Sequence, residues 1–337
     1  MTEYDTYLTL SFPSLSAFLS STSHLSIVSS TSTCSSSLLI LIRTSSSSPT
    51  TPTPWSSPPD STSSSSSSAP SSSSSPLPPT HLWNPLESSL ANIYSTAATQ
   101  FLRQNKPLSL VDVVLDQLRQ LPFCIPSNSR SINWIYSAQD DEPEIVGKKL
   151  RDRGSYEVVA MGGTFDHLHA GHKILLSMAC SIATKKLIVG VSDDALLGKK
   201  QFREYLESIE ERIGNVEKFI ELVRPTIRHQ VVPLQDVYGP TATDPDIQAL
   251  VVSLETASGG SAINKLRQER ELSILDTYTI NLVADDGTVE SESEGEVRVE
   301  TKMGSTGIRE WICRQQEGRR ENGEALNGDR GKERLES

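Results

Sequence analysis

Short apolar runs alternate with longer amphipathic stretches through the second half of the chain. Runs expected to form buried strands cover residues 158–161, 187–191, 228–232, 249–252 and 278–283. Helices are expected at about 171–183 and 205–223, where apolar residues recur at spacings of three and four. Apolar strands separated by helices predict an α/β domain over residues 151–317, with a parallel sheet covered on both faces. Ligands of such sheets bind beyond the carboxyl ends of the strands, so we expect the chemistry there.

The first 150 residues do not continue this pattern. Residues 1–80 are dominated by Ser, Thr and Pro, and we expect too few apolar side chains there to offset the entropy of ordering the chain. A disordered arm is therefore predicted over residues 1–80. In residues 81–150, two amphipathic stretches at 90–102 and 109–121 predict a small helical segment packed on the α/β domain, with Ser109 as an N-cap. A separate partner-docking module is the alternative interpretation of this segment, and residues 318–337 are expected to form a flexible polar tail.

Charge and cysteine content narrow the class of protein. The formal net charge of -11 argues against broad nucleic-acid binding, which requires a basic surface. The four cysteines lie far apart without a CxxC pair, so neither a zinc site nor a disulfide framework is indicated. The apolar stretch at residues 38–42 is too short to span a membrane. We expect a cytoplasmic protein, with the nucleus as an alternative, that has neither nucleic acid nor a membrane as a partner.

The strongest chemical signal is Met161-Gly-Gly-Thr-Phe-Asp-His-Leu-His-Ala-Gly-His172, which leaves the first predicted strand and opens the first helix. Its paired glycines let the backbone turn tightly and approach a ligand. His169 and His172 are three residues apart, so their rings can project from one face above the free N–H groups of the helix start, which form an anion site. Two imidazoles there suit a phosphate that gains charge in a transition state. A metal held by the protein is not expected, because only Asp166 lies near as a further ligand.

Gly163-Thr-Phe-Asp166 followed by His169-Ala-Gly-His172 resembles the signature of the nucleotidyltransferase superfamily, whose members attack the α-phosphate of a nucleoside triphosphate. The resemblance implies a Rossmann-like nucleotidyltransferase domain, with His169 and His172 as catalytic residues. It also implies contacts with ATP from Gly163, Thr164, Phe165, His169 and His172. Two other nucleotide-binding signatures, GxxxxGK[ST] and GxGxxG, are absent from the sequence.

A lysine that follows the second strand reaches the same α-phosphate in this superfamily. Lys199 is the best match and is expected to be catalytic and to contact the substrate, while Lys200 is a close rival. Two solvated lysines without a role in catalysis are the alternative interpretation.

Residues 302–309 resemble the Ser-Ser-Ser/Thr-x-x-Arg element with which the superfamily holds the β- and γ-phosphates. Ser305, Thr306 and Arg309 match this element and are expected to bind ATP. Gly304 stands in place of the usual first serine, which removes one hydroxyl group but keeps the backbone donor. A plain serine N-cap is the alternative interpretation.

The acceptor is indicated by Val-Val-Ser-Leu-Glu-Thr-Ala-Ser-Gly-Gly-Ser-Ala-Ile-Asn over residues 251–264, followed by a basic stretch at 265–270. This segment resembles the eukaryotic phosphopantetheine adenylyltransferases, and the whole resemblance covers about residues 156–311. It implies that Thr164, Glu255 and Arg267 help to bind the acceptor. An ordinary exposed position on a helix is the alternative for Arg267.

The resemblance implies transfer of AMP from ATP to 4'-phosphopantetheine, with release of pyrophosphate and with Mg²⁺ accompanying ATP. Association with other enzymes of coenzyme A biosynthesis is a further expectation. One rival is an adenylyl- or cytidylyltransferase with another acceptor, such as nicotinamide mononucleotide or a phospho-alcohol. The other is a catalytically weakened paralogue that acts as a scaffold, which only the substitution at Gly304 favours.

Overall fold

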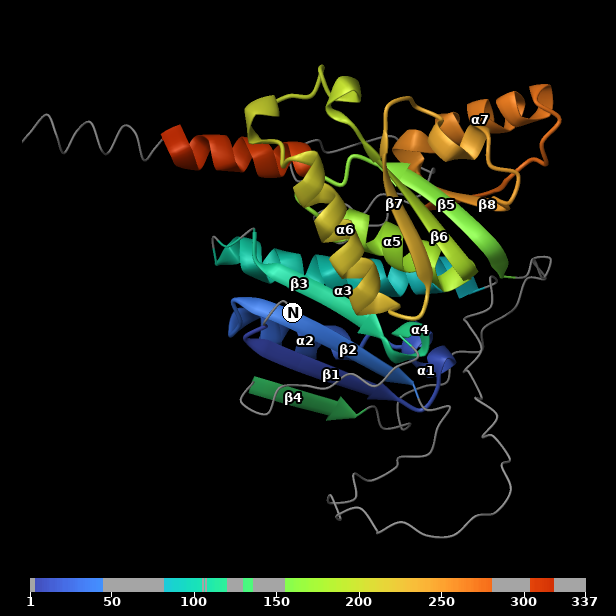
Figure 1. Cartoon of the computed structure of the whole chain (residues 1–337). Coiled ribbons are helices and arrows are strands. Elements are labelled where there is room, and N and C mark those ends of the chain that lie inside the picture. The colour runs from blue at the N-terminus through green and yellow to red at the C-terminus, as the bar shows by residue number, and fades with distance from the viewer. Residues whose placement is uncertain are drawn as a thin grey trace, which may run out of the picture.

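The computed structural model describes residues 4–44, 82–104, 106, 108–119, 130–135, 155–280 and 304–317. Within these ranges the chain forms two parallel sheets with flanking helices (Figure 1). The predicted α/β class is therefore confirmed. The remainder of the predicted arm at 45–80, residues 281–303 and the predicted tail at 318–337 lie outside the described residues.

The sheet of the predicted α/β domain has the strand order β7-β6-β5-β8-β9, and all its neighbouring strands are parallel. Its strands are β5 (Tyr156–Gly163), β6 (Ala183–Ser192), β7 (Arg228–Leu234), β8 (Ala249–Ser253) and β9 (Asp276–Ile280). The helices are α5 (Ala170–Ile182), α6 (Ile209–Val223) and α7 (Ala257–Glu269), and a last helix covers residues 305–317. Because β5 lies between β6 and β8, the carboxyl ends of these three strands meet at one edge of the sheet.

The start of α6 differs from the predicted helix at 205–223. Ser208 and Glu211 form a capping box: the Ser208 hydroxyl accepts from the Glu211 N–H at 3.2 Å, and the Glu211 carboxylate accepts from the Ser208 N–H at 2.9 Å. The helix therefore begins at Ile209, and residues Arg203–Tyr205 form a separate 3-10 turn. This separation leaves residues 203–207 free to lie across the loop that carries the candidate site.

The other sheet contains much of the segment that was expected to be disordered. Strands β1 (Thr6–Phe12) and β2 (Ser37–Thr44) pair in parallel at the centre of a sheet with the order β3-β2-β1-β4. The prediction of a disordered arm is therefore wrong for residues 6–44. The serine and threonine content hid two short apolar runs that are buried on both faces, as strands of parallel sheets are.

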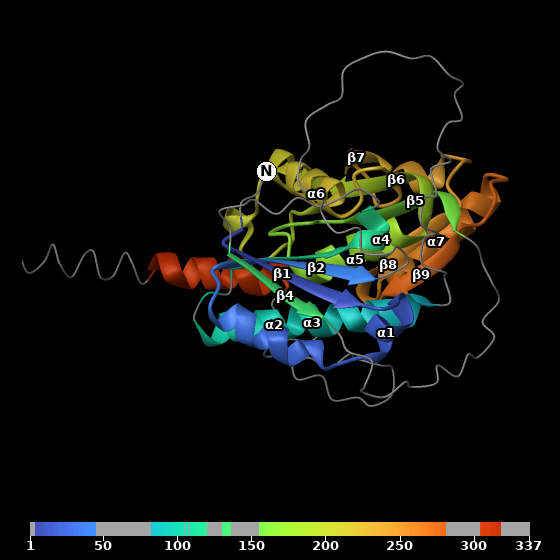
Figure 2. The same ribbon diagram turned by 90° about the horizontal axis from the view of Figure 1, so that it is seen from below.

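Three helices lie on one face of this sheet (Figure 2). They are α1 (Leu15–Ser20), α2 (His24–Thr33) and α3 (Trp83–Arg103). The serines of α2 are compatible with a helix because their hydroxyl groups donate to the preceding turn. Ser30 donates to the carbonyl of Ser26 at 2.6 Å, and Ser32 donates to the carbonyl of Val28 at 2.7 Å. These bonds allow polar residues to be packed against a buried sheet face.

The expected helical segment at 81–150 is helical only in part. The predicted helix at 90–102 lies within α3 and is confirmed. The predicted helix at 109–121 is wrong, because this stretch forms strand β3 (Leu110–Leu115) and the short helix α4 (Asp116–Arg119), and β4 (Arg130–Ile135) follows. Its valines are β-branched and suit a strand that is covered on both faces.

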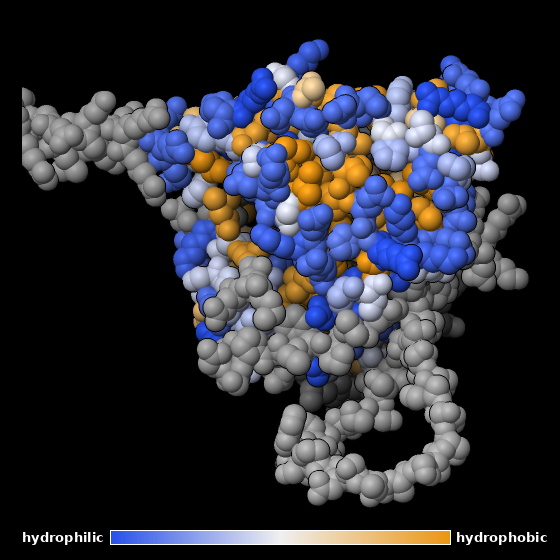
Figure 3. Space-filling model, viewed as in Figure 1, coloured by the Kyte–Doolittle hydropathy of each residue, from blue (hydrophilic) through white to orange (hydrophobic). Residues whose placement is uncertain are grey.

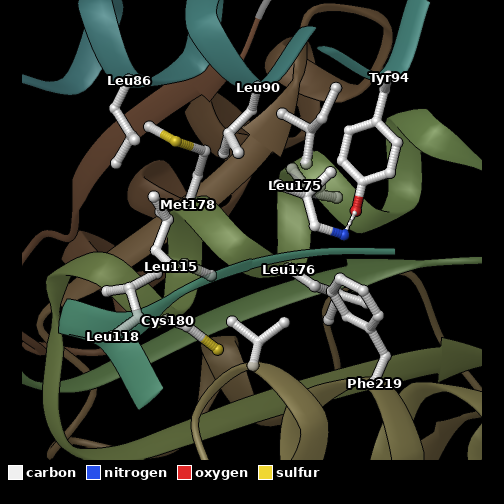
Figure 4. Packing of buried hydrophobic residues seen from close by; sticks show 14 of the residues in the cluster. Leu86, Leu90, Tyr94, Leu115, Leu118, Leu175, Leu176, Met178, Cys180 and Phe219 are labelled. Carbon is white, nitrogen blue, oxygen red and sulfur yellow. Dashed lines mark hydrogen bonds between the residues drawn. The ribbon is translucent and has the colours of Figure 1, made fainter. Parts of the chain in front are cut away.

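The two sheets share one hydrophobic core through α3 and α5. Figure 4 shows Leu86 and Leu90 of α3 facing Leu175 and Met178 of α5, with Leu115 of β3 beside them. All five side chains are buried. The part of the N-terminal region that the structure describes therefore packs directly on the helix that opens the candidate site.

The described surface is largely polar around a central group of hydrophobic residues on the face shown in Figure 3. Among the large hydrophobic side chains that are exposed, Leu196 follows β6, and Val237 and Tyr238 follow β7. All three therefore lie in loops at the carboxyl ends of strands. Of the helices in the described ranges, none has both the length and the apolar character that a membrane crossing requires.

Candidate functional site

The loop after β5 has a backbone that the neighbouring segment holds in place. Phe165 and His167 adopt left-handed conformations with φ values of 52° and 46°, which are unfavourable for residues other than glycine. Hydrogen bonds from the loop to residues 203–207 offset the cost of these conformations. The Glu207 carboxylate accepts from the His167 N–H at 2.6 Å, and the His167 ring lies 2.8 Å from the Tyr205 carbonyl oxygen. These contacts tie the loop to the segment that precedes α6.

His169 and His172 lie together at the start of α5, as the sequence pattern predicts. His169 is the N-cap residue, and the ring centroids of the two imidazoles are 3.9 Å apart at an interplanar angle of 35°. The Phe165 ring packs against His172 with centroids 5.2 Å apart. Both histidines keep partial solvent exposure, so the imidazole pair can be reached from the carboxyl edge of the sheet.

Both imidazoles are neutral near pH 7. Burial, followed by the charge of Lys173, lowers the pKa of His169 from 6.5 to about 4. The pKa of His172 is lowered well below its ordinary value by burial, and further by His169, Lys200 and Lys173. Within the described residues, Nδ1 of His172 is buried without a hydrogen-bond partner. Leaving a buried polar atom unpaired is costly, and a phosphate oxygen could accept a hydrogen bond from an N–H at this position.

We expect the low pKa of His169 to make stability depend on pH. The unfolded chain binds a proton at His169 as pH falls through about 6.5, whereas the folded chain binds it only near pH 4. The free energy of unfolding should therefore decrease as pH falls between these values. Urea unfolding at pH 7 and pH 5 checks this: wild type should lose more stability than His169→Asn, and equal losses would contradict the assignment.

The last helix closes the site from the other side, but Arg309 is not where the sequence pattern predicts. Its guanidinium is 1 % exposed, forms an ion pair with Asp166, and donates to the Gln201 carbonyl at 3.0 Å. The prediction that Arg309 grips the β- and γ-phosphates is therefore corrected, because its donors face protein acceptors and not the solvent-accessible edge. Ser305 donates to the Asp166 carbonyl at 2.9 Å, while Thr306 is exposed. Of the element at residues 302–309, the start of the helix is therefore the part that is still expected to bind a phosphate.

Arg212 is a structural residue of the site that the sequence reasoning missed. It is fully buried, and its guanidinium donates to the carbonyls of Thr164 at 3.1 Å and Ser192 at 2.7 Å. It also pairs with Asp194 at 3.2 Å and donates to the Glu207 carbonyl at 3.0 Å. Arg212 therefore joins the ends of β5 and β6 to the segment that supports the loop. Its position in an amphipathic helix suggests an exposed charge, so no local signal could have shown this.

The two candidate lysines both lie exposed in the loop that follows β6. The charge of Lys200 is among those that lower the pKa of His172. This contribution favours Lys200 over the predicted Lys199 as the residue that faces the same phosphate, and Lys199 stays a prediction.

The three residues expected to bind the acceptor are separated by the structure. Thr164 is partly exposed beside the histidine pair, and Glu255 is exposed directly after β8, at the same edge of the sheet. Arg267 is fully buried and donates to the carbonyls of Thr241, Asp244 and Ser273 at 2.7, 2.9 and 2.6 Å. These contacts lie near the amino end of β8, away from the ligand edge. The substrate role predicted for Arg267 is therefore corrected to a structural one.

The histidine pair lies in a region of the chain that is similar to known proteins. The model of the cytidylyltransferase-like family matches residues 160–287, which include the histidine pair. A phosphopantetheine adenylyltransferase of Saccharomyces cerevisiae is 43% identical over 158 residues, which are 46% of this chain and 51% of the yeast protein. An uncharacterized protein of Schizosaccharomyces pombe is 39% identical over 182 residues, or 54% of this chain and 55% of that protein. The chain thus spans about half the length of these two relatives.

A shorter relative from an archaeon is matched over most of its length. The phosphopantetheine adenylyltransferase of Methanopyrus kandleri is 38% identical over 145 residues, which cover 42% of this chain and 91% of that protein. Nearly the whole of this relative therefore corresponds to a single region of the chain. The match covers most of this relative, and it agrees with the paired histidines at the start of α5. The chain therefore belongs to the phosphopantetheine adenylyltransferase family.

Proposed function

We propose that the chain transfers AMP from ATP to 4'-phosphopantetheine, forming dephospho-coenzyme A and pyrophosphate. The observation that carries this proposal is the stacked pair of neutral imidazoles, His169 and His172, on the first turn of α5 at the carboxyl edge of the sheet. The relatives of Saccharomyces cerevisiae and Methanopyrus kandleri that bear the name of this activity support the choice of acceptor.

The geometry suits an α-phosphate that gains negative charge. The free N–H groups of the first turn of α5 and the helix dipole favour an anion at this point. A neutral imidazole can donate one N–H to a phosphate oxygen, and it can do so without the cost of holding a buried positive charge. We therefore assign His172, with its buried and unpaired Nδ1 atom, to the stabilisation of charge in the transition state.

The acceptor requires no general base. The second pKa of a phosphate monoester is about 6, so its oxygen is already ionised near pH 7. In-line attack on the α-phosphorus forms the new P–O bond, and pyrophosphate leaves with the electron pair of the broken bond. The protein contributes position and charge stabilisation, as in phosphoryl transfer generally.

Mg²⁺ enters this scheme as part of the substrate, bound to ATP. Among the residues that the structure describes, no group of three His, Cys, Asp or Glu side chains gathers as a metal site. Mg²⁺ commonly relies on substrate phosphates and water for most of its ligands. The apolar side chains of Leu196, Val237 and Tyr238 lie exposed in loops at the same edge and can contact the pantetheine arm.

An acceptor panel tests the proposal. The purified chain is incubated with MgATP and, in separate reactions, 4'-phosphopantetheine, nicotinamide mononucleotide or a phospho-alcohol, and pyrophosphate and the adenylylated product are measured. We expect turnover with 4'-phosphopantetheine alone. Turnover with another acceptor would show that the proposed acceptor is wrong. A folded chain without any turnover would favour the alternative of a catalytically weakened paralogue that acts as a scaffold.

Replacement of the two lysines separately gives a second prediction. Lys200→Ala should lower kcat by about 100-fold, since its charge, unlike that of Lys199, is among those that lower the pKa of His172, whereas Lys199→Ala should have a much smaller effect. Steady-state kinetics at saturating ATP measures both. The reverse order would restore Lys199 as the catalytic lysine.

The cytoplasm is the compartment that we propose, and association with other enzymes of coenzyme A biosynthesis is proposed as well. Both stay predictions that localisation of the tagged chain and co-purification can test.

A further inference from the structure

A buried ion pair joins the catalytic helix to the N-terminal sheet. Lys173 directly follows His172 on α5 and is 5 % exposed. Its ammonium lies 2.7 Å from a carboxylate oxygen of Asp112 and donates to the Val111 carbonyl at 2.7 Å. Asp112 and Val111 belong to β3, in the sheet that lies outside the region that resembles the family. A residue of the first turn of α5 is thus anchored by the other sheet.

The N-terminal region also holds the carboxylate of this pair. Asp112 is 4 % exposed and accepts a hydrogen bond from the hydroxyl of Tyr4. The hydroxyl of Tyr94, on α3, accepts from the Val113 N–H at 3.1 Å, which fixes the next residue of the same strand (Figure 4). Removal of one partner of such a pair leaves a buried charge without compensation, so the pair is expected to hold its geometry firmly.

The start of α5 has no side-chain cap. His169 is the N-cap residue, but its side chain makes no capping hydrogen bond, so the usual anchor of a helix start is missing. Gly171, between the two histidines, loses more conformational freedom on folding than any other residue would. The contacts of Lys173, one residue further along the helix, therefore give the other sheet a direct way to affect the orientation of the His172 ring.

We propose that Asp112 is a positioning residue for adenylyl transfer, which acts through Lys173 to fix the first turn of α5 and so the imidazoles of His169 and His172. This inference rests on the proposed function. It makes the N-terminal sheet part of the catalytic apparatus: β3 does not touch the substrates but determines where the catalytic rings lie. Small displacements of catalytic groups have large effects on rate, and about 1 Å can cost about 100-fold.

The test compares Asp112→Asn with Asp116→Asn in the full chain. Asp116 follows β3 in α4, and its carboxylate accepts from the Thr44 N–H at 3.3 Å, so it serves the N-terminal sheet without reaching α5. We expect Asp112→Asn to lower kcat by about 10- to 100-fold while both KM values change less than about twofold. Asp116→Asn should keep the wild-type kcat, and Asp112→Glu should recover part of the loss. Equal kcat values in the Asn variants would overturn the proposal.

A double-mutant cycle separates positioning from general loss of structure. If Asp112 acts through Lys173, then Asp112→Asn combined with Lys173→Met should lower kcat no more than the worse single variant. Multiplied losses would show that Asp112 acts by another route and would overturn the proposal. The double variant leaves neither charge of this pair buried without its partner. Its kcat can therefore still be measured if Asp112→Asn does not fold.

A spectroscopic measurement keeps this inference distinct from the proposed function. The imidazole ¹⁵N signals of His169 and His172 should shift in Asp112→Asn and stay unchanged in Asp116→Asn. This outcome would support positioning even if the chain adenylylated another acceptor. Unchanged signals in both variants would overturn the positioning role whatever the acceptor proves to be.

Discussion

His172→Ala is expected to lower kcat by about 100- to 1,000-fold, with little change in the affinity for ATP. The ring is neutral, its Nδ1 atom is buried without a partner among the described residues, and it lies where charge develops on the α-phosphate. Removal of one donor that acts mainly on the transition state typically costs about 3–4 kcal/mol of activation free energy. Steady-state kinetics and calorimetric titration with ATP measure the two quantities.

His229→Ala is the matched control for this experiment. His229 lies near the amino end of β7, opposite Leu187 of β6, and so away from the ligand edge of the sheet. We expect wild-type kcat from it. A kcat within about threefold of wild type in His172→Ala would remove His172 from the mechanism, and a large increase in the dissociation constant for ATP would make it a ground-state ligand.

Asp166→Ala is expected to lower the free energy of unfolding by about 3–5 kcal/mol. Asp166 is fully buried; it pairs with Arg309 and accepts from the Glu207 N–H at 2.9 Å. Its loss leaves the Arg309 guanidinium buried without its counter-charge, and this is the costly outcome for buried ion pairs. Arg309→Ala should destabilise to a similar extent, and the double variant should cost less than the sum of both. Urea unfolding measures all three.

An exposed ion pair on the same last helix provides the control. Arg314 pairs with Glu310 at 2.5 Å across one turn, and its side chain is 73% exposed. Arg314→Ala should cost less than about 0.5 kcal/mol, because exposed pairs of this kind contribute little. If Arg309→Lys kept full stability and raised only the KM for ATP, Arg309 would be a phosphate ligand after all, and the structural role assigned here would be wrong.

The spacing of apolar and polar residues in the sequence was enough to predict those elements whose structure is set by neighbouring residues. The apolar runs of β5, β6 and β8 and the three-and-four spacing of α6 predict buried strands and an amphipathic helix without knowledge of their partners. The motif from Gly163 to His172 likewise predicts that both imidazoles lie on one face, because they are three residues apart at a helix start, and the ring centroids are 3.9 Å apart. These features could be predicted because backbone periodicity alone sets them.

Tertiary structure alone decided which charged residues are buried. Arg212, Arg267 and Arg309 each stand in a helix where sequence suggests a solvated or ligand-facing charge, yet all three donate to protein carbonyls or carboxylates in the interior. Their partners lie at distances along the chain that no local pattern encodes, from 5 residues for the Glu207 carbonyl to 143 residues for Asp166. Burial of a charge depends on whether such partners are present.

The N-terminal sheet shows the same limit on a larger scale. The serine-rich segment has too few apolar residues to fold by itself, and its composition therefore predicts disorder. Strands β1 and β2 become stable because β3 and β4 pair with them and the helices α2 and α3 share their core. Sequence alone predicted the imidazole pair, whereas the ion pair of Lys173 with Asp112, which we propose positions it, exists only because two distant segments pack together.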